Sequence, residues 1–125
     1  MTQEKKQLVL KTLCSMLPYG VKVQVYDNRY APVILTQIDV KKQECIFNFN
    51  VPVENCLPYL RSMSSMTEKE KEEYCDLDYL IRFATNSTRA SARLLDFCNS
   101  HHLDYNGLIP MGLALEAHKD MYNIK

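Results

Sequence analysis

One pair of residues in the chain has the spacing of metal ligands. Cys98 and His101 stand three positions apart, which on a helix places both side chains on one face. A structural zinc site needs four ligands, typically from two such pairs, and the sequence holds no second pair of this spacing. Both residues also fall on the apolar face of a predicted helix. We therefore interpret them as a packed cysteine beside a hydrogen-bonded histidine, and expect no metal.

Other catalytic arrangements have less support. A nucleophilic cysteine needs a base beside it and a third group that orients the base. Cys98, His102 and Asp104 supply these types, but they stand too close together at a helix end to align, and Asp104 is better explained as a cap. The carboxylates from Glu68 to Asp78 show no sign of the burial that tunes a catalytic acid. With three glycines, the chain has no phosphate-binding loop. We expect no enzymatic activity, no catalytic residue and no cofactor.

Basic and aromatic residues gather in the first third of the chain. Single-stranded nucleic acids bind proteins through base stacking and phosphate contacts, and such groups on the exposed face of a small sheet would suit that role. Alternatively, the tyrosines cover the edge of the core and the lysines keep the sheet edges soluble. The candidate nucleic-acid-binding residues are Lys22, Tyr26, Arg29, Lys41 and Lys42, with Tyr19 and Tyr30 as further aromatic groups and with Arg82, Arg89 and Arg93 as a second basic group.

A protein-interaction role is the preferred interpretation. Six methionines and eight tyrosines supply the adaptable and the rigid contact surfaces that interfaces use. The same side chains are equally compatible with a place in the core. The candidate protein-interaction patch consists of Tyr59, Met63, Met66 and Tyr74.

The predicted sheet lies between residues 20 and 49. Alternation of valine with polar residues predicts a strand over 21–26, and stretches rich in β-branched or aromatic residues predict strands over 33–40 and 44–49. Joined in sequence, these strands form a small antiparallel meander, or an SH3-like partial barrel if a further strand joins them. The segment 51–61 contains two prolines and is predicted to be a connector.

Helices are predicted on both sides of this sheet. Apolar spacing indicates a helix over 3–17, capped by Thr2 and stopped by Pro18. Thr67 and Glu70 have the spacing of a capping box, which starts a helix over 68–75, and a further helix is expected over 89–101. The segment 78–85 fits helix and strand alike, with a slight preference for helix. The apolar segment 104–116 is expected to dock on the core, and the residues from about His118 to fray.

The totals indicate a single α+β domain with helices covering the sheet. The 125 residues include 46% apolar and 24% charged side chains, and fifteen basic groups balance fifteen acidic ones, so no global field attracts nucleic acid or an anionic membrane. No apolar run approaches the roughly twenty residues that span a bilayer, and the N-terminus does not resemble a signal peptide. We expect a cytosolic protein whose five dispersed cysteines are buried thiols.

Three stretches carry a resemblance to known proteins. They are Leu17–Gln24 (LPYGVKVQ), Pro58–Glu68 (PYLRSMSSMTE) and His101–Glu116 (HHLDYNGLIPMGLALE). In this order they resemble a group of small proteins of unassigned function from phages and prophages of gut Bacteroidales. Ser62 and His118 depart from the group, which often has proline at both places. The resemblance implies a mobile-element origin and a bacterial cytosol, and it carries over no catalytic residue.

These observations together predict a non-enzymatic phage or prophage accessory module that binds a protein, with a host or defence component as a candidate partner. The alternative is a single-stranded nucleic-acid-binding protein that uses its sheet face. No membrane association is expected, and the sequence does not indicate an oligomeric state.

Overall fold

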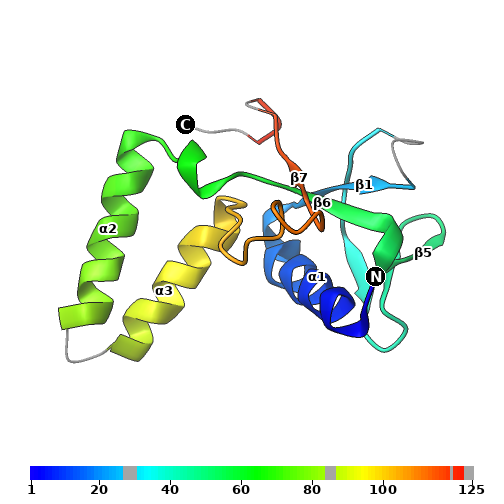
Figure 1. Ribbon diagram of the computed structural model, residues 1–125, viewed down its shortest axis with the longest axis horizontal. Coiled ribbons are helices and arrows are strands. Elements are labelled where there is room, and N and C mark those ends of the chain that lie inside the picture. Colours follow the sequence, from blue (N-terminus) through cyan, green and yellow to red (C-terminus); the bar gives the residue numbers. More distant parts are fainter. Residues whose placement is uncertain (27–30, 84–86, 119, 123–125) are drawn as a thin grey trace.

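The computed structural model describes residues 1–26, 31–83, 87–118 and 120–122 (Figure 1). Within them the chain has the predicted α+β composition, with small sheets and covering helices. The helices are α1 (Gln3–Met16), α2 (Glu68–Phe83) and α3 (Ser87–Ser100). The strands are β1 (Lys22–Val25), β2 (Val33–Ile34), β3 (Gln37–Asp39), β4 (Glu44–Ile46), β5 (Asn50–Pro52), β6 (Cys56–Leu60) and β7 (Leu115–Glu116).

The strands form two sheets where the sequence predicted one. A four-stranded sheet has the order β2-β1-β6-β7, and an antiparallel meander has the order β3-β4-β5. The predicted strand over 33–40 is divided at Leu35, whose side chain is buried and whose amide donates to the Val21 carbonyl at 2.9 Å. Its first half therefore pairs with β1 and its second half with β4. The predicted strand over 44–49 pairs only as far as Ile46.

Strand β6 corrects the prediction of a connector over 51–61. It pairs antiparallel with β1 on one side and parallel with β7 on the other, so it lies in the interior of the four-stranded sheet. Cys56 and Leu60 are fully buried in it, as is Val53 in the 3₁₀ turn that precedes it (Val53–Asn55). The two prolines suggested an irregular segment, whereas burial against the core holds the chain extended.

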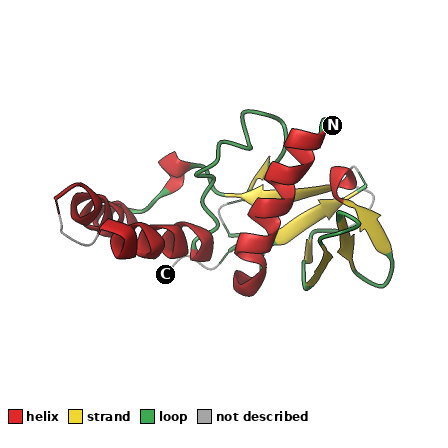
Figure 2. Ribbon diagram, turned by 90° about the horizontal axis from the view of Figure 1, so that it is seen from below, coloured by secondary structure: helices red, strands yellow, loops and turns green. Residues whose placement is uncertain are grey.

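Helix α1 covers the sheets (Figure 2). The Thr2 side chain caps it by accepting from the Lys5 amide at 3.2 Å, as predicted. Val9, Leu13 and Met16 are fully buried on its inner face. The helix ends one residue before the predicted Leu17 and continues into a 3₁₀ turn (Leu17–Tyr19).

Helices α2 and α3 form an antiparallel hairpin beside the sheets (Figures 1 and 2). Helix α2 runs eight residues past its predicted end at Cys75, so the described part of 78–85 is helical up to Phe83. Helix α3 begins at Ser87 and ends at Ser100, close to the predicted 89–101. A small cluster of four buried residues joins the two helices: Leu77, Phe97, Cys98 and Leu103.

The segment after α3 packs against the main core. The Asp104 carboxylate accepts from the amides of Leu108 at 2.7 Å and Ile109 at 2.9 Å, which confirms its predicted capping role. Leu108 and Leu113 are buried in the main core with α1 and the strands. The predicted fraying from His118 is wrong for Tyr122, which is buried.

Candidate functional site

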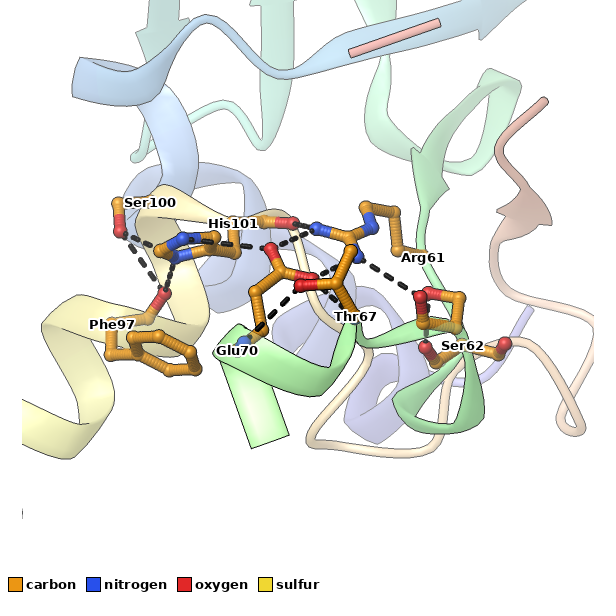
Figure 3. A network of polar contacts seen from close by, with 8 residues as sticks. Arg61, Ser62, Thr67, Glu70, Phe97, Ser100 and His101 are labelled. Carbon is orange, nitrogen blue, oxygen red and sulfur yellow. Dashed lines mark hydrogen bonds and ion pairs between the residues drawn. The ribbon is translucent and has the colours of Figure 1, made fainter. Parts of the chain in front are cut away.

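A buried ion pair lies where the four-stranded sheet meets the helical hairpin (Figure 3). Arg61 follows β6, and Glu70 lies in the first turn of α2. The two Nη groups of Arg61 donate to the two carboxylate oxygens of Glu70, at 2.9 Å and 2.7 Å. Both side chains are almost completely buried. Planar pairing of this kind fixes direction as well as distance, so it sets how α2 leaves the sheet.

The same carboxylate completes the predicted capping box. Glu70 Oε1 accepts from the Thr67 amide at 2.8 Å, and Thr67 Oγ1 accepts from the Glu70 amide at 3.2 Å. The hydrogen bonds from Arg61, together with the Thr67 amide, lower the pKa of Glu70 to about 2 despite its burial. The sequence indicated Glu70 as a capping residue on a solvated face. It did not indicate Arg61 as a second partner, because Arg61 falls in the segment 51–61, which was predicted to be a connector.

His101 lies at the other side of Glu70. Its Nδ1 is 2.8 Å from the Phe97 carbonyl, which can only accept, so Nδ1 carries a proton. Its Nε2 lies 3.6 Å from Glu70 Oε2, and its ring packs on Phe97 at a centroid distance of 4.3 Å. Nδ1 is therefore engaged by the Phe97 carbonyl, whereas Nε2 lies beyond hydrogen-bond distance of the Glu70 carboxylate.

A pocket of about 630 Å³ opens above this network. Arg61, Glu70 and His101 contribute to its wall on one side, and the C-terminal residues 120–122 on the other. Charges of both signs line it, including Lys22, Lys69, Glu73 and Asp120. It is a polar pocket with no net preference for an anion or a cation.

Tyr122 bridges two strands at the edge of this pocket. Its hydroxyl donates to the Tyr59 carbonyl at 2.7 Å and accepts from the Lys22 amide at 2.9 Å. Its ring stacks on His102 at 3.7 Å, with the planes 9° apart. His102 Nε2 lies 2.8 Å from the Tyr19 carbonyl, and burial lowers the pKa of His102. The β1–β6 pairing ends at Val23 and Pro58, and the tyrosine hydroxyl links the next two residues, Lys22 and Tyr59.

The structure does not bring the candidate nucleic-acid-binding residues together. Lys22 lies beside the pocket, where its Nζ donates to the Met121 carbonyl at 2.8 Å. Lys41 and Lys42 are exposed in the turn between β3 and β4, on the other sheet. Tyr26 is half-buried against the main core. Arg29, like Tyr30, lies outside the described residues.

The second basic group is also dispersed. Arg82 forms an exposed ion pair with Asp78 at 3.1 Å. Arg93 and Asp96 line a shallow groove between α2 and α3, and Arg89 is exposed near the start of α3.

The candidate protein-interaction patch is buried at one residue and half-buried at the other three. Tyr59 is buried in β6. Met63, Met66 and Tyr74 are half-buried and pack against the small cluster of the hairpin. Of the two interpretations that the sequence allowed, the burial of these side chains fits a structural place in the core.

The residues of the catalytic and metal-binding arrangements considered from the sequence have other environments in the structure. Cys98 is buried, and burial raises the pKa of its thiol to about 11. His102 and Asp104 have other partners, on Tyr19 and on the 108–109 amides. Among the described residues, no group of three or more His, Cys, Asp and Glu side chains is placed to hold a metal ion. Cys14 and Cys75 are exposed, contrary to the expectation of five buried thiols.

An exposed apolar face on α2 was missed by sequence reasoning. Tyr79 is 62% exposed, Phe83 70% and Leu80 38%. The rings of Tyr79 and Phe83 contact each other at a centroid distance of 4.7 Å. We call these three residues the α2 tip. The alternation of Tyr79, Ile81 and Phe83 was the available signal, but alternation is typical of a strand, and the helical spacing lay in other apolar residues of the segment.

Comparison with models of known families, with curated proteins and with solved structures finds no match to this chain. The resemblance to phage and prophage proteins therefore stays a prediction. No helix in the described parts of the chain has the length and apolar character needed to cross a membrane.

Proposed function

We propose that this protein is a non-enzymatic accessory module that binds a protein partner through the α2 tip. The observation that carries the proposal is the exposure of Tyr79, Leu80 and Phe83 together on a helix. Large apolar side chains that cluster on a surface mark interaction sites more often than isolated ones. Aromatic residues are also the side chains that interfaces favour.

The contacts that hold the first turn of α2 also support this proposal. Tyr79 and Phe83 stand on a helix whose start is held by the capping box and by the Arg61–Glu70 pair. A contact surface that is already ordered loses little conformational freedom on binding, which favours affinity. The residues of the α2 tip thus stand on a helix that is fixed at its first turn.

The biological setting of the proposal comes from the sequence resemblance. A phage or prophage origin would place the module in the bacterial cytosol, with a component of the host or of its defence as the partner. No residue of the chain selects among such partners.

A second candidate function is binding of single-stranded nucleic acid by the β3-β4-β5 meander. The observation in its favour is that Lys41 and Lys42 are exposed at one end of β4, while Phe49 is 44% exposed beyond the other. Stacking on an aromatic ring and contacts of lysines with phosphates are the two elements of such binding.

A tagged pull-down from the bacterial host distinguishes the two functions. Half of each eluate is treated with nuclease, and the proteins are identified by mass spectrometry. We expect a stoichiometric, nuclease-resistant partner that is lost with the double variant Tyr79→Ser and Phe83→Ser. The control variant Val40→Ser, at a residue 60% exposed in the turn after β3, retains it. Retention of the partner by the double variant contradicts the proposal. A nuclease-sensitive absorbance at about 260 nm that is lost on changing Lys41 and Lys42 to Glu supports the second function.

A further inference from the structure

The α2 tip is one half of a longer exposed stripe on the same helix. Glu72, Asp76, Tyr79 and Phe83 are spaced by four, three and four residues, which places them along one side of a helix. All four are exposed. Glu73 and Leu80 flank the stripe at the corresponding levels. The stripe is therefore acidic in its first half, near the sheet, and apolar in its second half, at the tip.

The helix carries more acidic than basic residues, and few of its basic groups pair with the acidic half. Helix α2 holds six acidic and three basic residues, and two of the basic side chains pair elsewhere on the helix, Lys71 with Glu68 and Arg82 with Asp78. Within the described parts of the chain, the structure contains no ion pair of Glu72, Glu73 or Asp76. Glu72 and Asp76 are exposed and available to a basic partner, whereas Glu73 lies in the groove that Arg93 also lines.

A second copy of the chain does not complement this stripe. In a two-fold symmetric dimer each partner presents the same surface. If two α2 helices paired in parallel, Glu72 and Asp76 would face their own copies, which like-charge repulsion disfavours. If they paired antiparallel along their length, Tyr79 and Phe83 would cover unpaired carboxylates, which burial disfavours.

We propose that the partner bound by α2 presents an amphipathic helix that is apolar in one half and basic in the other. This inference rests on the proposed function and names its partner class. The apolar half covers Tyr79, Leu80 and Phe83, and lysines or arginines of the basic half lie against Glu72, Glu73 and Asp76. The charges fix the direction in which the partner helix lies, because the reverse orientation covers the Glu72 and Asp76 carboxylates with apolar side chains and leaves them without a counter-charge.

Two synthetic peptides test this partner class. Each forms a helix of about five turns with a leucine-rich half, and the other half carries exposed lysines in one peptide and glutamates in the second. Binding to the full chain is measured by titration calorimetry. We expect the lysine peptide to bind at least about tenfold more tightly than the glutamate peptide, and its affinity to fall as salt is raised from about 50 mM to about 500 mM.

Variants assign the contacts. Phe83→Ser removes binding of the lysine peptide, and the double variant Glu72→Gln and Asp76→Asn weakens it by about fivefold to tenfold while removing most of its salt dependence. Two controls leave it unchanged: Glu68→Gln, which removes an exposed acidic group from the same helix, and Leu95→Ser, which alters an exposed apolar residue of α3. Circular dichroism verifies that each variant keeps its helices.

The possible results distinguish failure of the basic partner class from failure of the α2 tip as a binding site. Equal affinity for the two peptides, with binding still lost in Phe83→Ser, overturns the basic partner and leaves the α2 tip as a binding site. Binding that survives Phe83→Ser, together with a host partner that survives it in the pull-down, overturns both. A dimer seen by sedimentation and lost in Phe83→Ser identifies a second copy as the occupant and overturns the basic partner.

Discussion

Glu70 serves two neighbours at once, and one of them, the buried Arg61 guanidinium, depends on its being charged. Its carboxylate accepts hydrogen bonds from the Arg61 guanidinium and from the Thr67 amide. Burying an ion pair costs solvation, which good geometry and additional hydrogen bonds offset. Removal of one partner leaves the other charge buried and unpaired, and that is far more unfavourable than the absence of both.

The first prediction concerns this charge. Glu70→Gln keeps the size of the side chain but leaves the buried Arg61 guanidinium without a counter-charge, so we expect the free energy of unfolding to fall by about 3 kcal/mol. The control is Glu68→Gln, whose side chain is 94% exposed and whose replacement shifts stability by no more than about 0.5 kcal/mol. Urea denaturation of both variants measures the difference. Similar losses in the two variants would contradict a special role for Glu70.

The second prediction concerns acid. The folded-state pKa of Glu70 is about 2, below its ordinary value of 4.5, so the unfolded chain binds a proton more readily. The stability due to this group is complete above pH 4.5 and is lost as the pH falls towards 2, by on the order of 3 kcal/mol. The lowered pKa of His102 causes a separate loss that begins as the pH falls through its ordinary value of 6.5.

Denaturation at several pH values measures this dependence. The loss below pH 4.5 should be absent in Glu70→Gln, whereas the loss that begins near pH 6.5 should remain. If the Glu70→Gln variant loses the same stability below pH 4.5 as the unchanged protein, the loss is due to other carboxylates.

At the level of single residues, local chemistry was predictable and distant partners were not. The capping roles of Thr2, Thr67 and Asp104 depend on residues within five positions, so the sequence indicates them directly. Arg61 and Tyr122 reach partners nine and more than sixty residues away. Nothing in the spacing of a single sequence encodes such pairs.

At the level of elements, the helices were predictable in type and the strands in part. Helix α1 has a clear apolar face and a cap, and its bounds were nearly correct. Helix α2 was predicted too short because the apolar residues of Asp78–Phe83 follow a pattern that fits either state. Strand β6 was not predicted because Pro52 and Pro58 favour an irregular segment. The burial of its side chains, which holds the strand extended, is a property of the folded chain and does not appear in the sequence pattern.

The third prediction tests how the C-terminal segment completes the four-stranded sheet. Tyr122→Phe removes the hydroxyl between the Lys22 amide and the Tyr59 carbonyl, so both backbone groups lose a partner in a buried place. We expect the free energy of unfolding to fall by about 1–3 kcal/mol. Tyr19→Phe, at a residue 39% exposed, is the control and should be close to neutral. Thermal or urea denaturation checks both, and an equally stable Tyr122→Phe variant would show that water replaces the hydroxyl.

At the level of the whole molecule, the interior is divided unequally. The main cluster holds sixteen buried residues among those described, from α1, the strands and the C-terminal segment, whereas the cluster of the hairpin holds four. Tyr105 packs against both clusters. Regions with few buried apolar contacts open at lower free energy than the main core.

The fourth prediction follows from this division. In native-state hydrogen exchange, the amides of residues 77–83 in α2 should exchange faster than those of β1 and β6. Phe97→Ala should lower protection mainly in α2 and α3, whereas Leu13→Ala should lower it throughout the chain, since a fully buried leucine is worth about 2–5 kcal/mol. Uniform loss of protection in both variants would mean that the two clusters unfold as one unit.

The Arg61–Glu70 pair also has a mechanical consequence. From Glu70 to Phe83 the helix rises by about 20 Å, so α2, together with α3 packed against it, is a lever that the Arg61–Glu70 pair ties to β6. A tilt of about five degrees at this pair displaces the far end by about 2 Å, since displacement grows with this length. A force applied at Phe83, for example by a bound partner, is therefore transmitted through Glu70 to Arg61. Arg61 directly follows β6, so the force reaches a strand inside the four-stranded sheet.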